Sequence, residues 1–145
     1  MFIACISLSI NKSFAQQESV QDKLMKYKLV MDNGEDGPIT VGYTTYTKTR
    51  SIYNMDDIGL EPIIDPYYLS RNMQSLSFND SRVGKKINGK YLYTHTNNSL
   101  GRPKTLYILK ILTLTDHMLE LQLIVPDPMT IIGPPSIRTY IAHPL

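Results

Sequence analysis

The longest strand signal in the chain is Thr105-Leu-Tyr-Ile-Leu-Lys-Ile-Leu-Thr-Leu-Thr-Asp-His-Met-Leu-Glu-Leu-Gln-Leu-Ile-Val125. Apolar residues alternate with other residues in two runs, 105–115 and 118–125, which is the pattern of a β-strand with one buried face. The runs meet at the polar pair Asp116-His117. The stretch therefore predicts two long antiparallel strands joined as a hairpin.

A second alternating stretch, residues 83–95, is interrupted by Asn88-Gly89. Asparagine and glycine both tolerate the positive φ that a two-residue hairpin turn requires, so this dipeptide predicts a second hairpin. Tyr91 and Tyr93 follow at a spacing of two residues, which places them on one face of the returning strand.

Shorter patterns predict further strands on both sides of these hairpins. Alternating or β-branched residues predict strands at 25–31, 39–53, 74–79 and 136–142. Within the third of these, Leu76 and Phe78 are expected to face inward. Many short strands with tight turns and almost no helix indicate an all-β fold, in which sequential hairpins favour an antiparallel up-and-down meander closed into a β-barrel. A β-sandwich is the alternative.

Two segments depart from the strand pattern. Residues 16–26 predict a short helix, because Val20 and Leu24 share one face and Ser19 is a suitable cap. Residues 54–71 contain one glycine and two prolines and are predicted to form a long loop, the kind of segment that often carries function. Its section 56–65 is a candidate lid.

The first fifteen residues are expected to be a signal peptide. An apolar run at 2–10 precedes Ser13-Phe14-Ala15, which places small residues where a signal peptidase requires them. The run is too short to span a membrane. We therefore expect cleavage after Ala15, a mature domain of residues 16–145 and a secreted or periplasmic location.

Composition excludes several classes of function. The chain has 15 Lys and Arg against 13 Asp and Glu, with no basic block longer than Lys85-Lys86. Nothing in this balance favours a nucleic-acid partner or an anionic membrane surface. The single cysteine, Cys5, belongs to the expected signal peptide. The mature domain would then have no disulfide, no thiolate nucleophile and no cysteine metal ligand.

No catalytic or metal-binding motif is complete. The acidic segment 32–36 lacks the ligand spacing of a calcium loop, since Gly34 and Tyr43 occupy its third and twelfth positions. His95, His117 and His143 are widely separated, and no spacing supports a metal site. There is no Gly-x-Ser-x-Gly elbow to activate a serine. We expect no enzyme activity, no cofactor and no metal.

Several short motifs follow one another along the chain, namely Met25-Lys-Tyr-Lys-Leu-Val30, Leu76-Ser-Phe-Asn79, Gly89-Lys-Tyr-Leu-Tyr93, Leu114-Thr-Asp-His-Met-Leu-Glu-Leu121 and Arg138-Thr-Tyr140. In this order they resemble the strands of the small lipocalin-like domains of secreted bacterial proteins. Those domains usually have glycine and tryptophan where this chain has Met25 and Tyr27. The resemblance spans most of residues 24–142, and it implies a barrel that binds a small apolar molecule.

Tyrosine is the dominant aromatic residue, with ten in the chain and no tryptophan. Inward-pointing tyrosines in a barrel line a cavity and orient a ligand through their hydroxyl groups. The alternative is that they are half-exposed residues that stabilise the sheet by cross-strand packing. The candidate ligand-binding residues are Tyr43, Tyr46, Tyr91, Tyr93 and Tyr107.

These observations give a leading hypothesis and two rivals. The first is a lipocalin-like protein that binds an apolar or amphipathic small molecule in its barrel, without catalysis. The second is a protein-interaction module with a filled β-sandwich core and an unknown protein partner. The third is a hydrolase on a β scaffold. An enclosed cavity lined by tyrosine and leucine would favour the first.

Overall fold

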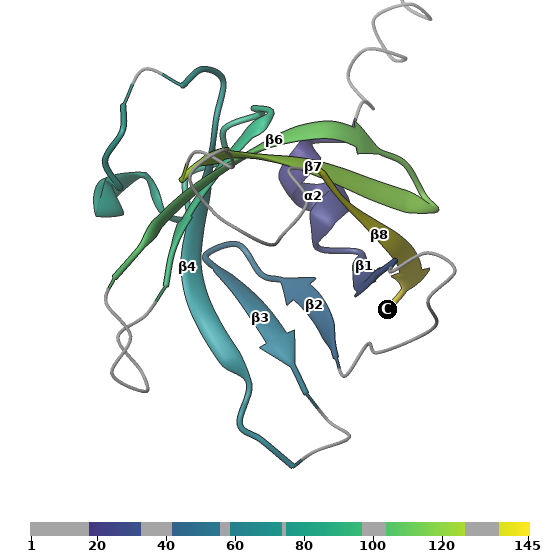
Figure 1. Cartoon of the computed structure of the whole chain (residues 1–145). Coiled ribbons are helices and arrows are strands. Elements are labelled where there is room, and N and C mark those ends of the chain that lie inside the picture. Colours follow the sequence, from purple (N-terminus) through teal and green to yellow (C-terminus); the bar gives the residue numbers. More distant parts are fainter. Residues whose placement is uncertain (1–17, 33–41, 56–58, 74, 97–103, 127–136) are drawn as a thin grey trace, which may run out of the picture.

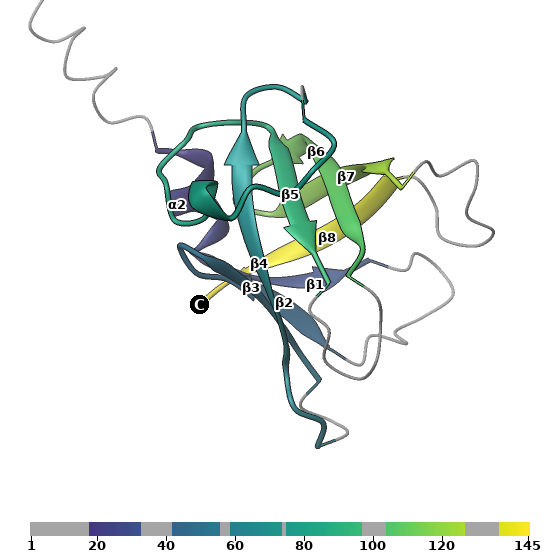
Figure 2. The ribbon, with the colours of Figure 1, turned by 90° about the vertical axis from the view of Figure 1, so that its left-hand side faces the viewer.

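The structure is a computed structural model, and it describes residues 18–32, 42–55, 59–73, 75–96, 104–126 and 137–145. Its strands follow one another around a closed antiparallel barrel, in which β8 pairs with β1 (Figures 1 and 2). The predicted up-and-down β-barrel is confirmed, and the sandwich alternative is wrong. The strands are β1 (Tyr27–Met31), β2 (Tyr43–Tyr46), β3 (Arg50–Asn54), β4 (Ile63–Ser70), β5 (Tyr91–His95), β6 (Leu106–Leu114), β7 (Met118–Val125) and β8 (Ile137–Pro144).

The longest strand signal forms the hairpin it predicts. β6 and β7 pair from Ile108 opposite Val125 to Leu114 opposite Leu119. Thr115 organises the turn, since its Oγ1 accepts hydrogen bonds from the backbone N–H groups of residues 117 and 118 at 3.2 and 3.1 Å. These bonds satisfy donors that the strand ladder leaves unpaired.

The stretch 39–53 was expected to be one strand, and this expectation is wrong. Residues 43–46 and 50–54 form the separate strands β2 and β3, which pair with each other. Thr47 makes the turn between them, because its Oγ1 accepts from the backbone N–H of Arg50 at 3.0 Å and of Thr49 at 3.3 Å. A threonine hydroxyl can replace the glycine or asparagine of a turn in this way.

The expected loop at 54–71 contains β4, so that part of the prediction is also wrong. Pro66 has no N–H group and normally argues against a strand. Here Pro66 lies opposite Arg50, the first residue of β3, where the ladder is ending. On its other side its carbonyl accepts a hydrogen bond from Thr94 Oγ1 at 2.9 Å. The candidate lid, 56–65, therefore overlaps a barrel strand, and residues 56–58 lie outside the described residues.

The hairpin predicted at Asn88-Gly89 does not form. Of the stretch 83–95 only β5 is a strand, and the described residues of 71–90 belong to a long connection from β4 that includes the short 3₁₀ helix Asp80–Arg82. Gly89 serves close packing, because a Cβ there would lie 2.3 Å from the carbonyl of Ser70. Asn88 Oδ1 accepts a hydrogen bond from the backbone N–H of Val20 at 3.1 Å. The dipeptide thus fixes this connection against β4 and the N-terminal helix.

The strand predicted at 74–79 is also absent among the described residues of that stretch. Leu76 is 69% exposed, which contradicts its expected inward position, whereas Phe78 is partly buried. Phe78 packs on the outer face of β4, β5 and β6, where Tyr68, Tyr93 and Ile108 form what we call the outer cluster. Tyr68 and Tyr93 stack with ring centroids 4.9 Å apart. The connection 71–90 therefore covers an apolar patch on the outside of the barrel.

The predicted helix forms as α2 (Val20–Leu24), and Ser19 caps it by accepting from the backbone N–H of Asp22 at 3.1 Å. α2 lies across one end of the barrel (Figures 1 and 2). Gln21 Nε2 donates to the carbonyl of Lys48, in the β2–β3 turn, at 2.9 Å. Lys23 forms an ion pair with Asp116, in the β6–β7 turn, at 3.6 Å. These contacts join the helix to turns that close this end.

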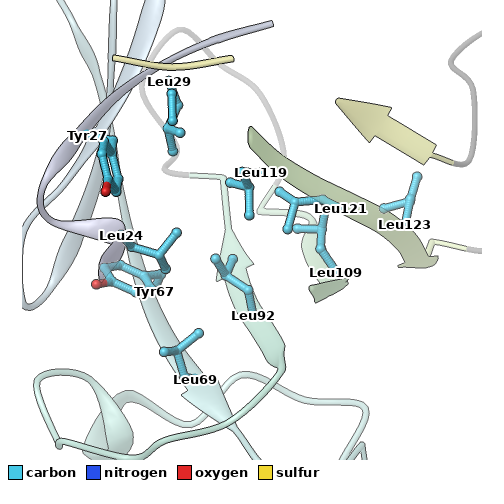
Figure 3. Packing of buried hydrophobic residues seen from close by; sticks show 11 residues of the cluster. Leu24, Tyr27, Leu29, Tyr67, Leu69, Leu92, Leu109, Leu119, Leu121 and Leu123 are labelled. Atoms are coloured by element: carbon cyan, nitrogen blue, oxygen red, sulfur yellow. The ribbon is translucent and has the colours of Figure 1, made fainter. Parts of the chain in front are cut away.

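Leucine fills one side of the barrel interior. Leu24 of α2 is completely buried and lies beside Tyr67 (Figure 3). Most of the leucines that pack with them come from β4, β5, β6 and β7, so this side of the barrel is solid. The inner core consists of Leu24, Tyr27, Leu29, Tyr67, Leu69, Leu92, Leu109, Leu119, Leu121, Leu123 and Ala142.

Candidate functional site

The other side of the barrel interior is hollow. It contains a partly open cavity of about 290 Å³ bounded by β1, β2, β3, β4 and β8. Three tyrosines, two charged residues and a few apolar and hydroxyl side chains make its wall. The lining residues are Leu29, Met31, Gly42, Thr44, Tyr46, Ser51, Tyr53, Ile63, Asp65, Arg138 and Tyr140.

Strand register explains why these residues gather. Leu29 lies opposite Thr44, Thr44 opposite Tyr53, and Tyr53 opposite Ile63. Directly opposed residues in antiparallel strands point to the same face of the sheet. Because Leu29 is buried in the inner core, this row of side chains faces the barrel interior. On β8, Tyr140 lies opposite core residue Leu119 and faces inward for the same reason.

The cavity reaches the end of the barrel opposite α2. Met31 is the last residue of β1 and Ile63 is the first residue of β4, and both lie at the end that faces away from the helix. Toward α2 the cavity extends to Tyr46, whose ring packs edge-on against Tyr67 with centroids 5.1 Å apart. Tyr67 is fixed by a hydrogen bond from its hydroxyl to the carbonyl of Thr47 at 2.6 Å. The Tyr46–Tyr67 pair therefore bounds the cavity on the side of α2.

The hydroxyl groups of two lining tyrosines, Tyr46 and Tyr140, are in a weakly hydrated environment. Burial raises the pKa of Tyr46 far above its ordinary value of 10.0, and the neighbouring Tyr140 and Tyr67 add to the rise. Burial likewise raises the pKa of Tyr140, while the adjacent Arg138 guanidinium opposes the rise. Among the described residues, no side-chain hydrogen bond occupies the Tyr46 hydroxyl. These phenols stay neutral at physiological pH and can donate hydrogen bonds to a bound molecule.

Alkaline pH is expected to lower the stability of the fold through these tyrosines. Because the folded-state pKa of Tyr46 is raised, its contribution is fully present below the ordinary pKa of 10.0 and is lost as pH rises. The unfolded chain then releases a proton that the folded chain retains. The urea midpoint should therefore fall between about pH 8 and about pH 11. The decrease should be smaller in Tyr46→Phe, which cannot ionise, and an equal decrease in both proteins would contradict this assignment.

The five tyrosines chosen from sequence divide among four environments. Tyr46 lines the cavity. Tyr107 packs against the inner core without lining the cavity. Tyr91 packs against the outer cluster and Tyr93 belongs to it. Tyr43 lies under the ammonium group of Lys28, with the nitrogen 3.9 Å from the ring centroid. Only one of the five is therefore placed to contact a molecule in this cavity.

Sequence reasoning missed Tyr53, Tyr140 and Arg138. Tyr53 was assigned to one continuous strand, and the turn at Thr47 changes which side chains share its face. Arg138, Tyr140 and Ala142 are every second residue of β8 and therefore share one face, and Ala142 is a core residue. That alternation is the signal that could have identified them.

Metal binding and histidine catalysis find no support in the described part of the chain. His95 is buried, with Nδ1 3.3 Å from the carbonyl of Thr96, and His117 lies in the β6–β7 turn. No three His, Cys, Asp or Glu side chains of the described residues gather as metal ligands. Most of the acidic segment 32–36 and the expected signal peptide lie outside those residues. No helix within the described ranges is long and apolar enough to cross a membrane.

Searches against protein-family models, curated protein sequences and solved structures gave no significant match to this chain. The barrel and its cavity are therefore the basis on which its function is inferred.

Proposed function

We propose that this protein binds a small, largely apolar molecule inside its barrel and carries out no catalysis on it. The observation that supports this is the cavity of about 290 Å³ bounded by inward-facing side chains of five strands. Ligand pockets typically combine apolar and aromatic walls with a few polar groups that orient the ligand. Leu29, Met31 and Ile63 supply the apolar wall, and Tyr46 and Tyr53 supply hydroxyl groups.

The size of the cavity limits the ligand and its affinity. A volume near 290 Å³ is at the lower end of ligand pockets, so a medium-chain aliphatic or a single-ring compound is the appropriate class. Burying roughly 200 Å² of apolar ligand surface contributes about 5 kcal/mol. Taken alone this corresponds to a Kd of about 0.2 mM, and association costs offset part of it, so we expect a Kd in the millimolar range.

A hollow interior is also what distinguishes this proposal from the protein-interaction module, which requires a filled core. The leucine core occupies only the side formed mainly by β4, β5, β6 and β7 together with α2. Side chains that fill a barrel only in part leave space for a small ligand. The lipocalin-like resemblance of the sequence agrees with this use of the barrel and stays part of the proposal.

Titration of the purified chain with octanol tests the proposal, because octanol is neutral, flexible and small. We expect saturable binding of one molecule per chain by isothermal titration calorimetry. Native mass spectrometry of protein purified from its own source is expected to show a retained small molecule. The proposal would be contradicted if octanol, octanoate and octylammonium all failed to bind saturably and no retained molecule were found.

A further inference from the structure

Besides the tyrosines, two of the residues that line the cavity have ionisable side chains, Arg138 on β8 and Asp65 on β4. Charged side chains inside a barrel are costly unless a partner compensates them. In the order of the closed barrel, β8 and β4 are separated by β1, β2 and β3 on one side and by β5, β6 and β7 on the other. The two charges therefore belong to opposite walls of the barrel.

Arg138 is held toward the cavity by its register. It lies opposite Leu121 of β7, a residue of the inner core, so its side chain starts from the inner face of the sheet. Arg138 forms no ion pair with another described residue, since the three ion pairs of that part of the chain involve Lys23, Lys26 and Lys86. A guanidinium has five N–H donors in a planar fork. Arg138 lines the cavity, so its guanidinium is placed to contact a molecule bound there.

Tyr140 lies next to Arg138 on the same wall. The guanidinium acts on the Tyr140 phenol through its charge and by hydrogen bonding, and because arginine can only donate, the phenol oxygen is the acceptor. The Tyr140 O–H group is then directed away from Arg138. An N–H fork beside a phenol O–H is a suitable pair of donors for a carboxylate, which accepts through two oxygens.

We propose that the cavity selects amphipathic monocarboxylates, with the carboxylate bound by Arg138 and Tyr140 and the apolar chain packed against Leu29, Met31 and Ile63. This inference rests on the proposed function and specifies its ligand class. Asp65, on the opposite wall, disfavours a second anionic group, so a dicarboxylate is a poorer ligand than a monocarboxylate.

The test compares octanoate, octanol and octylammonium, which share one chain and differ in the charge of the head group. Octanoate is expected to bind the unmodified protein about tenfold or more tightly than octanol, and octylammonium more weakly than both. In Arg138→Met, octanoate should lose roughly tenfold to a hundredfold in affinity while octanol keeps its Kd. Arg138→Lys preserves the positive charge and should recover part of the octanoate preference.

The outcomes separate this inference from the proposed function. If octanol binds as tightly as octanoate, or if Arg138→Met weakens both ligands equally, selection of a carboxylate is overturned while binding in the barrel stands. If octylammonium binds best, Asp65 sets the preference and the inference is again overturned. If none of the three binds, the proposed function is overturned, and this inference, which rests on it, is overturned as well. Circular dichroism and thermal unfolding of both Arg138 variants establish that they are folded, and Tyr140→Phe offers a second variant, in which octanoate should weaken more than octanol.

Discussion

Replacing Leu24 by alanine is expected to lower the free energy of unfolding by about 2 to 5 kcal/mol, the range for removing a fully buried leucine side chain. Leu24 is 0% exposed and packs with Tyr67 in the inner core. Alanine is an excellent helix former, so the substitution leaves the helical propensity of α2 intact. The loss would therefore report the cavity created where α2 closes the barrel. Because small domains are stable by only about 5 to 15 kcal/mol, this is a large fraction of the total.

Leu76→Ala is the matched control for this prediction. It removes the same atoms from a side chain that is 69% exposed, so its effect should stay within about 0.5 kcal/mol. Urea denaturation followed by circular dichroism measures both variants. Equal losses for the two leucines would contradict the placement of α2 across the end of the barrel and would return Leu76 to the inward position that its sequence pattern suggested.

The second large effect concerns the cavity. Thr44→Phe should weaken octanol binding by about tenfold or more, because the added ring occupies space that the ligand needs. Thr44 lines the cavity and lies opposite the buried Leu29. Displacing roughly 60 Å² of buried ligand surface costs about 1.5 kcal/mol, which is about a factor of ten in Kd.

Thr45→Phe is the control for this variant, because it introduces the same ring one residue later on the same strand. Adjacent strand residues point to opposite faces, and Thr45 lies opposite Ile52, outside the set of lining residues. Its octanol affinity should equal that of the unmodified protein. Thermal unfolding first establishes that both variants fold cooperatively. Calorimetric titration then measures the octanol Kd of each variant. Equal affinities for Thr44→Phe and Thr45→Phe would place the octanol site somewhere else.

Where sequence prediction succeeded, the signal was long or its chemistry was unambiguous. The β6–β7 hairpin combines two runs of eight or more residues with a turn that Thr115 stabilises. The cap of α2 was also recognisable, since Ser19 accepts from the backbone N–H group for which N-cap serines are selected. These local rules needed no knowledge of the neighbours.

Where prediction failed, tertiary contacts had overruled a local rule. Pro66 is tolerated in β4 because the ladder with β3 ends opposite it. Gly89 is required by the close approach of Ser70 and not by a hairpin turn. Phe78 contributes to the outer cluster from an irregular connection. Each of these depends on a residue distant in sequence, so alternation alone could not reveal it.

The candidate site was harder to predict than the fold for the same reason. Which tyrosines face inward depends on strand parity, and a turn misplaced by a few residues reverses it. Tyr46 was identified. Tyr53 was missed because the position of the β2–β3 turn was not predicted, and Tyr140 was missed because the register of β8 against the core strands was not known. Once β8 is paired with β7, the alternation of Arg138 and Tyr140 opposite Leu121 and Leu119 places both at the cavity.

Binding inside the hollow side of the barrel is tested most directly by nuclear magnetic resonance. Backbone amide signals are assigned and followed while octanol is added. We expect the largest shifts at cavity residues, led by Leu29, Thr44, Tyr53 and Tyr140, and little change at Tyr68 and Tyr93 of the outer cluster. Shifts that concentrate on the outer cluster, or a titration that leaves the cavity residues unchanged, would contradict the assignment of this cavity as the ligand site.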